Sequence, residues 1–343
     1  GKTLEELINI HRKSNGPVTM TSFIGEVSRG FGRVVRDEEG HVSAIVEQAD
    51  ATPEQLSIRE YNVSAYCFQA DWLWDALEKV PISPKGEYYL TDVVGIAVDQ
   101  GHQVDSLVLE DATEAIGINN RVHLATAEKR MQQRINNKLM LDGVTIIDPD
   151  TTFIEVDVQI GQDTVIHPNT HLRGETVIGE DCQIGPDTVL MDTHVGNQVE
   201  IIASVAEEAE LSNRVTMGPY CHLRKGAVLK EDVHLGNFGE VKDSVLGAGT
   251  KMGHMSYIGN ATIGKRVNIG AGTITCNFDG EKKNPTEIGD EAFIGSDTML
   301  VAPIKIGDRS VTGAGAVVTR DVPQDSLVLG VPAKEKRKLE KSD

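Results

Sequence analysis

Aliphatic residues recur at every sixth position through much of the second half of the chain. The longest unbroken run comprises Ile160, Ile166, Leu172, Ile178, Ile184 and Leu190. A period of six fits neither an α-helix, with 3.6 residues per turn, nor a long flat strand, with a period of two. It indicates a short strand and a turn, repeated many times, with each aliphatic side chain pointing into a narrow interior.

Three such repeat units make one triangular coil, and the coils bury their faces on one another. The sequence therefore predicts a β-solenoid. Glycine follows many of the repeat aliphatics, and we expect it to relieve crowding at the corners. The segment 276–287 (CNFDGEKKNPTE) breaks the repeat with polar residues, glycine and proline, which predicts a loop leaving the solenoid.

Residues 1–120 lack the six-residue period. Helical patterns at 4–12 and 70–79 alternate there with apolar runs at 33–35, 42–46 and 108–109, which predicts an α/β domain. Residues 121–141 read as one helix with Val122, Met131 and Leu139 near one face. We predict a mixed fold: an α/β domain (1–120), a linker helix (121–142), a parallel β-helix (143–322) and a C-terminal tail (323–343).

The net charge of the chain excludes some classes of function. The 343 residues include 33 Lys and Arg against 52 Asp and Glu, a net charge of −19, which argues against binding to nucleic acid or to anionic membranes. A small anion remains possible, because a few clustered cations dominate a local site. The four cysteines form no C-x-x-C pair, and no apolar run reaches the ~18 residues of a membrane helix. We expect a cytoplasmic protein without disulfides.

Cations in the repeats are the first candidates for chemistry. Arg224 and Lys242 each follow a repeat aliphatic and are separated by three repeat units, which make one coil, so they should stack. Lys282 and Lys283 lie in the predicted loop. Together these residues would enclose an anion such as a sugar phosphate. The alternative is that each cation is an ordinary solvated side chain.

His254 and the stretch NIGAGTITCNFDG are the other candidates. A neutral histidine in a cleft is a suitable general base at cytoplasmic pH, although a lone histidine is more often a surface or subunit-contact residue. The small residues around Ala271 leave space for a ligand along a coil edge, and Asn268 and Asn277 offer neutral hydrogen bonds. Tight corners alone would also explain the glycines.

Several motifs along the chain resemble those of a known family. The motifs GEYYLTD, GINNR, HLGNFGEVK, GHMSYIG, VNIGAGTITCNFDG, IGSDTMLVAP and AGAVVTRDV are similar to those of the bifunctional N-acetylglucosamine-1-phosphate uridyltransferase/glucosamine-1-phosphate acetyltransferases, the GlmU family. The resemblance runs from the first residues to about residue 322 and implies a left-handed β-helix, a homotrimer and synthesis of UDP-N-acetylglucosamine for peptidoglycan, the cell wall and lipopolysaccharide.

The resemblance also implies roles for single residues. His254 is then the general base that deprotonates the substrate amine. Contacts to the amino-sugar phosphate come from Arg224, Lys242, Tyr257, Asn268, Asn277 and Lys283, and contacts to acetyl-CoA from Ala271, Ser296 and Ala314. Two positions depart from the family: Phe278 stands where a tyrosine is usual, and Val331 stands where an arginine near coenzyme A is common.

The front of the chain departs further. The family's glycine-rich L-x-x-G-x-G-T-x-M loop, which holds the UTP phosphates, does not occur here. What the resemblance leaves is a partial site for the UDP-sugar and for Mg²⁺. Its sugar-nucleotide positions are Gly32, Glu47, Asn62, Tyr89 and Thr91, and its magnesium position is Asn119. We expect no complete uridyltransferase site, either because the chain is truncated or because the N-terminal part lies elsewhere.

Three functions follow from these features. The leading one is an acetyltransferase that uses acetyl-CoA and glucosamine-1-phosphate. The second is a non-catalytic regulatory or assembly subunit with the same two kinds of domain. The incomplete N-terminal domain favours this alternative, whereas His254 and the neighbouring cations argue against it. The third is a solenoid carbonic anhydrase, which needs three metal-binding histidines at a subunit seam.

Overall fold

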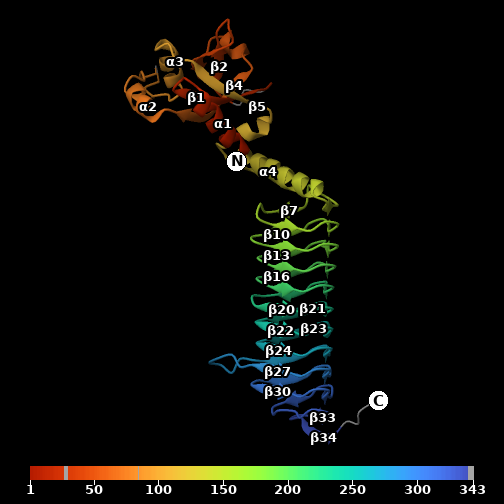
Figure 1. The fold of residues 1–343 in the computed structure, drawn as a ribbon. Helices are drawn as coiled ribbons and strands as arrows, with labels where there is room; N and C mark the ends of the chain where they lie inside the picture. The colour runs from red at the N-terminus through yellow and green to blue at the C-terminus, as the bar shows by residue number, and fades with distance from the viewer. Residues whose placement is uncertain (27–29, 84, 339–343) are drawn as a thin grey trace. The chain divides into compact units, whose positions relative to one another are not determined.

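The computed structural model describes residues 1–26, 30–83 and 85–338. The chain divides into two compact units, Gly1–Glu128 and Lys129–Asp343. The division falls inside helix α4 (Arg121–Leu141), which has the bounds that the sequence predicts. Figure 1 traces the order of the elements along the chain.

The first unit is a five-stranded sheet with helices. The strands are β1 (Val18–Ile24), β2 (Arg33–Arg36), β3 (Val42–Val46), β4 (Glu60–Phe68) and β5 (Val104–Leu109). The helices are α1 (Lys2–Lys13), η1 (Gln55–Ser57), α2 (Ala70–Leu77), α3 (Asp92–Asp99) and η2 (Ala112–Ala115). The sheet order is β3-β2-β4-β1-β5, and β1 and β5 are parallel whereas the other pairs are antiparallel.

The predicted α/β character of this unit is confirmed, but its centre was not predicted. The helices at 4–12 and 70–79 and the strands at 33–35, 42–46 and 108–109 all coincide with observed elements. The two longest strands, β1 and β4, and the helix α3 were missed. Strand β1 is buried over Val18–Phe23, threonines and serine included, so it has no alternating pattern to read.

The apolar face predicted for α4 is only half right. Leu139 is buried against the first solenoid coils, but Val122 is 74% and Met131 50% exposed. The buried polar residue of this helix is Asn136, whose amide donates to the carbonyls of Pro149 (3.0 Å) and Thr152 (3.2 Å). These bonds fix the end of the helix on the first coil.

The second unit is the predicted solenoid, a left-handed parallel β-helix. Each coil contributes a strand to three faces. The first face holds β6 (Thr145–Ile146), β9 (Val165–Ile166), β12 (Gln183–Ile184), β15 (Glu200–Ile201), β18 (Thr216–Met217), β25 (Asn268–Ile269), β28 (Phe293–Ile294), β31 (Val311–Thr312) and β33 (Ser326–Leu329). It is the face of the inward residues Leu235, Met252 and Ile269.

The second face holds β7 (Phe153–Ile154), β10 (His171–Arg173), β13 (Val189–Met191), β16 (Val205–Glu207), β19 (His222–Leu223), β26 (Ile274–Cys276), β29 (Met299–Val301) and β32 (Val317–Val318). Two nine-residue strands, β21 (His234–Lys242) and β23 (Lys251–Gly259), run through the first and second faces. They join these two faces into one sheet at the middle of the solenoid.

The third face is a separate nine-stranded sheet. It holds β8 (Gln159–Ile160), β11 (Val177–Ile178), β14 (His194–Val195), β17 (Glu210–Leu211), β20 (Ala227–Leu229), β22 (Ser244–Leu246), β24 (Ala261–Ile263), β27 (Thr286–Ile288) and β30 (Ile304–Ile306). The break predicted at 276–287 is confirmed: the chain leaves the solenoid after β26 and returns at β27, and the loop between them projects outward (Figure 1).

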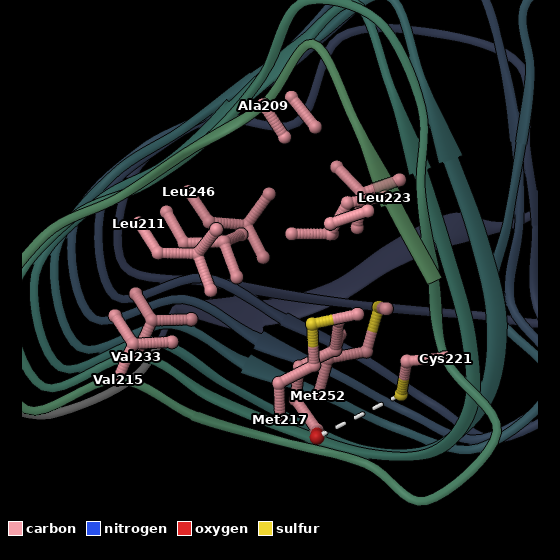
Figure 2. Packing of buried hydrophobic residues seen from close by; sticks show 14 of the residues in the cluster. Ala209, Leu211, Val215, Met217, Cys221, Leu223, Val233, Leu246 and Met252 are labelled. Atoms are coloured by element: carbon pink, nitrogen blue, oxygen red, sulfur yellow. Dashed lines mark hydrogen bonds between the residues drawn. The ribbon is translucent and has the colours of Figure 1, made fainter. Parts of the chain in front are cut away.

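The repeat aliphatics fill the interior. Ile166, Leu172, Ile184 and Leu190 are fully buried, and Figure 2 shows the equivalent side chains of the middle coils pointing into the triangular cross-section. Glycine after a repeat aliphatic relieves crowding, as predicted, and the crowded neighbour is the backbone of the next coil. A Cβ on Gly179 would lie 2.7 Å from the carbonyl of Gly196, so glycine is needed for the close approach of successive coils.

The solenoid extends beyond residue 322. Strand β33 pairs in parallel with β31, so residues that the sequence assigned to the tail form one more solenoid strand. Strand β34 (Lys334–Lys338) then pairs antiparallel with β33 and ends the sheet with an exposed strand. The sequence missed this coil because proline and glycine interrupt the six-residue pattern there.

Candidate functional site

The two predicted phosphate-binding cations stack as expected. Leu223 of β19 pairs in register with Val241 of β21, so Arg224 and Lys242, the next residues, occupy the same position on successive coils. The backbone N–H of Arg224 donates to the carbonyl of Val241 at 2.9 Å. Successive strands lie about 4.8 Å apart, which brings both side chains within reach of one small anion.

A third cation reaches this position from the projecting loop. The Nζ of Lys283 lies 3.9 Å from a carboxylate oxygen of Asp243, the residue that follows Lys242. The neighbouring ammonium of Lys283, and then the charge of Arg224, hold the pKa of Lys242 below its ordinary value. We call Arg224, Lys242 and Lys283 the cation triad. Like charges held this close favour binding of an anion.

Two carboxylates flank the triad. Glu240 accepts a hydrogen bond from Nη1 of Arg224 at 3.0 Å, and Asp243 lies beside Lys283. Neither carboxylate was predicted from the sequence. Glu240 was predictable, because a residue two positions before Lys242 in a strand lies on the same face. Asp243 faces Lys283 only because the loop folds back.

Tyr257 and Asn277 meet over a glycine next to the triad. The amide of Asn277 donates to Oδ1 of Asn260 at 2.8 Å. A Cβ on Gly259 would lie 2.7 Å from Nδ2 of Asn277 and closer still to the hydroxyl of Tyr257. The missing side chain of Gly259 therefore provides the space that both polar groups occupy. Neither Gly259 nor Asn260 was predicted.

His254 lies in β23, three residues before Tyr257, and its side chain is exposed. In the part of the chain that the structure describes, no side chain bonds to its imidazole. Strand β23 keeps one register with the next coil, since Lys251 pairs with Asn268 of β25 and Tyr257 pairs with Ile274 of β26. This register places Ala271 at the position of His254, one coil further on.

The three predicted coenzyme positions continue this line. The next two coils also keep a constant register through both faces, so Ser296 and then Ala314 follow Ala271. We call His254, Ala271, Ser296 and Ala314 the corner column, because it runs along the corner between the first and second faces. Ser296 and Ala314 are exposed and Ala271 is half-buried, so small residues line the corner beside the histidine.

Asn268 is separated from the triad. It pairs with Lys251 and Phe293 on the first face, three residues before the corner column. The triad, Tyr257 and Asn277 lie on or after the second face. Within one chain, the predicted sugar contacts therefore fall on both sides of one corner.

Four of the predicted UDP-sugar positions lie together in the first unit. The hydroxyl of Thr91 donates to Oε1 of Glu47 at 3.0 Å, and the N–H of Asn62 donates to the carbonyl of Gly32 at 2.9 Å. A Cβ on Gly32 would lie 3.5 Å from Glu47 Oε1, which joins the two pairs. Tyr89 is half-buried. Burial raises the pKa of Tyr66, which was not predicted, to about 12.

The predicted magnesium position offers a poor ligand set. Asn119 lines a cavity of about 320 Å³ with Gly30, Phe31, Ile116, Gly117, His123 and Thr126. Mg²⁺ prefers carboxylate oxygens, and the described residues of this lining supply none. Across the described residues, no group of three or more His, Cys, Asp and Glu side chains converges on a metal-sized space. The residues present do not fit a magnesium site.

No helix in the described ranges is both long and apolar enough to cross a membrane.

Comparison with known proteins supplies the family. A bifunctional protein GlmU of Heliobacterium modesticaldum is 46% identical over 330 residues, which cover 96% of this chain and 72% of that protein. One of Fervidobacterium nodosum is 48% identical with the same coverage. The chain belongs to the GlmU family. Residues 157–192 and 285–320 also match the bacterial transferase hexapeptide family (six repeats).

GlmU membership makes this chain an enzyme, an acetyltransferase of UDP-N-acetylglucosamine synthesis. It disfavours the non-catalytic alternative, since the curated relatives are bifunctional proteins. Among solved structures, a UDP-N-acetylglucosamine acyltransferase of Francisella novicida is 14% identical with a TM-score of 0.40, covering 56% of this chain and 68% of that one.

Proposed function

We propose that this GlmU-family chain transfers the acetyl group of acetyl-CoA to the amine of glucosamine-1-phosphate. The cation triad carries the proposal: Arg224, Lys242 and Lys283 come together in an acidic protein, beside the neutral hydrogen-bonding groups of Tyr257 and Asn277. Cations would bind the phosphate, and hydroxyl and amide groups would bind the sugar hydroxyls.

The chemistry needs a base and no protein nucleophile. His254 accepts a proton from the substrate amine as its nitrogen attacks the thioester. The amine nitrogen bonds to the thioester carbon, the carbon–sulfur bond breaks, and the sulfur leaves with a proton returned from His254. The products are N-acetylglucosamine-1-phosphate and coenzyme A. The exposed imidazole of His254, which no described side chain bonds, is free for both transfers.

Acetyl-CoA would lie along the corner column. Ala271, Ser296 and Ala314 present small side chains on successive coils beside His254, which leaves space for an extended chain. This arrangement supports a thioester placed at the histidine and a coenzyme running toward the C-terminal coils.

A homotrimer is part of the proposal. Tyr220 and Phe238 stack at 5.5 Å on successive coils, one residue past the corner position, and are 63% and 57% exposed. Large exposed apolar side chains in a row are typical of an interface. A neighbouring subunit packed on this corner would cover Tyr220 and Phe238. It would also bring its own first face, which carries Asn268, toward the triad.

The test is release of the coenzyme A thiol with a panel of acceptors: glucosamine-1-phosphate, glucosamine-6-phosphate and glucosamine. We expect the highest kcat/KM with glucosamine-1-phosphate and only a trace with glucosamine, which lacks the phosphate. Equal turnover of glucosamine, or none of the three by folded protein, would refute the proposal. Sedimentation is expected to give three times 37.2 kDa.

A further inference from the structure

We infer that Asp279 is a positioning residue of the acetyl-transfer site: it fixes the loop 277–285 so that Lys283 completes the cation triad. The inference rests on the proposed function for the identity of the substrate. Asp279 itself is exposed, and in the described structure it forms no hydrogen bond or ion pair with Arg224 or Lys242, so its effect on the site passes through the loop.

The bonds of Asp279 enclose Lys283. Oδ1 accepts from the backbone N–H of Glu281 at 2.9 Å and from that of Lys282 at 2.8 Å. Oδ2 accepts from the amide of Asn284 at 2.8 Å. Lys282 and Asn284 are the residues immediately before and after Lys283. One carboxylate thus holds the chain on both sides of the lysine.

The base of the loop is fixed separately. The N–H of Asn284 donates to the carbonyl of Asn277 at 2.6 Å, and Phe278 and Lys283 form an antiparallel bridge. Asn277 and Asn284 are 7% and 8% exposed, so the base is buried in the solenoid edge. Without Asp279 we therefore expect the base of the loop to stay attached while its tip, residues 279–282, becomes mobile and holds Lys283 less firmly in the cation triad.

Charge makes this anchoring necessary. Lys283 lies next to two other cations, and its carboxylate partner, Asp243, is 3.9 Å away, at the outer limit of an ion pair. Fixing a long lysine side chain from a mobile loop beside like charges costs conformational entropy. The three hydrogen bonds to the carboxylate of Asp279 offset this cost before substrate binds. They also lower the pKa of Asp279 to about 2, so the carboxylate remains charged under working conditions.

The kinetic test compares three variants of the full chain. Asp279→Ala should raise the KM for glucosamine-1-phosphate about tenfold and leave the KM for acetyl-CoA and kcat within about twofold. Asp279→Asn keeps an oxygen that accepts the backbone N–H groups and should recover most of the loss. Glu281→Ala removes a neighbouring exposed charge and is the matched control, with an unchanged KM.

A second measurement does not depend on activity. Trypsin cuts after lysine, and the loop contains Lys282 and Lys283. Asp279→Ala should speed cleavage at these sites about tenfold over wild type, and Asp279→Asn should not. Unchanged cleavage and KM would overturn the inference. Faster cleavage with no turnover by any variant, wild type included, would instead refute the proposed function and keep the loop anchor.

Discussion

The two units of this chain assemble their candidate sites in different ways. In the solenoid, Arg224 and Lys242 come together because they lie one coil apart, and the corner column follows the same rule. In the first unit, Gly32, Glu47, Asn62 and Thr91 come from separate segments that meet only through sheet pairing and one side-chain bond. A repeating backbone converts sequence spacing into distance, whereas an α/β fold does not.

The units also differ in how complete their sites are. The solenoid places the cation triad beside the neutral groups of Tyr257 and Asn277, with His254 three residues before Tyr257 in β23. The first unit brings Gly32, Glu47, Asn62 and Thr91 together, but the described residues that line its Asn119 cavity include none of the carboxylates that Mg²⁺ prefers.

Uridylyl transfer gives the largest expected contrast. It requires backbone N–H groups and a cation around the triphosphate, with Mg²⁺ neutralising the developing charge. We expect the 343-residue chain to make no measurable UDP-N-acetylglucosamine from UTP and N-acetylglucosamine-1-phosphate, measured as pyrophosphate release, while thiol release from acetyl-CoA continues. Magnesium-dependent pyrophosphate release would show that residues 1–120 form a complete site and would remove the difference between the units.

Substitution of the base should have the next largest effect. His254→Ala should lower kcat for acetyl transfer by about 10² or more, because the amine must lose its proton in the reaction. His234→Ala is the matched control: it removes another solenoid histidine, whose Nδ1 lies 2.7 Å from the hydroxyl of Thr216. Circular dichroism should show both variants folded. Equal kcat values for the two variants would rule out His254 as the base.

Substitution of Gly259, beside Tyr257, should lower activity less than substitution of His254 but more than substitution of Gly253. Gly259→Ala places a Cβ against both Tyr257 and Asn277, so we expect kcat/KM to fall about tenfold through their displacement. A Cβ on Gly253, in the same strand, meets nothing within 4 Å, so Gly253→Ala should unfold at the wild-type temperature. If Gly259→Ala kept full activity, the arrangement of these two side chains would be irrelevant to catalysis.

The smallest expected effect is a pH dependence of substrate binding. Because Lys283 and Arg224 lower the pKa of Lys242, this lysine loses its charge at a lower pH than an ordinary lysine does. The KM for glucosamine-1-phosphate should therefore begin to rise at a lower pH than the titration of an ordinary lysine would give, while kcat stays level. Lys242→Arg, which remains charged, should flatten the rise. If wild type and Lys242→Arg gave the same pH profile of KM, the rise would come from a group other than Lys242.

Much of the solenoid and its site was predictable from sequence. The six-residue period identified the inward residues, the break at 276–287 identified the loop, and the spacing of three repeat units placed Arg224 over Lys242. These features depend on neighbours one coil away, and each coil repeats the same local geometry. The resemblance of its motifs indicated the family, which comparison with curated relatives confirmed.

The tertiary structure alone decided the rest. The order β3-β2-β4-β1-β5, with the buried and non-alternating β1 near its centre, depends on pairing between distant segments. In the solenoid, the contact of Asp243 with Lys283 and the space above Gly259 arise where a loop of irregular length folds back on the coils. Such contacts have no fixed spacing in sequence, because loop closure and side-chain packing, not a repeating backbone, determine which residues meet.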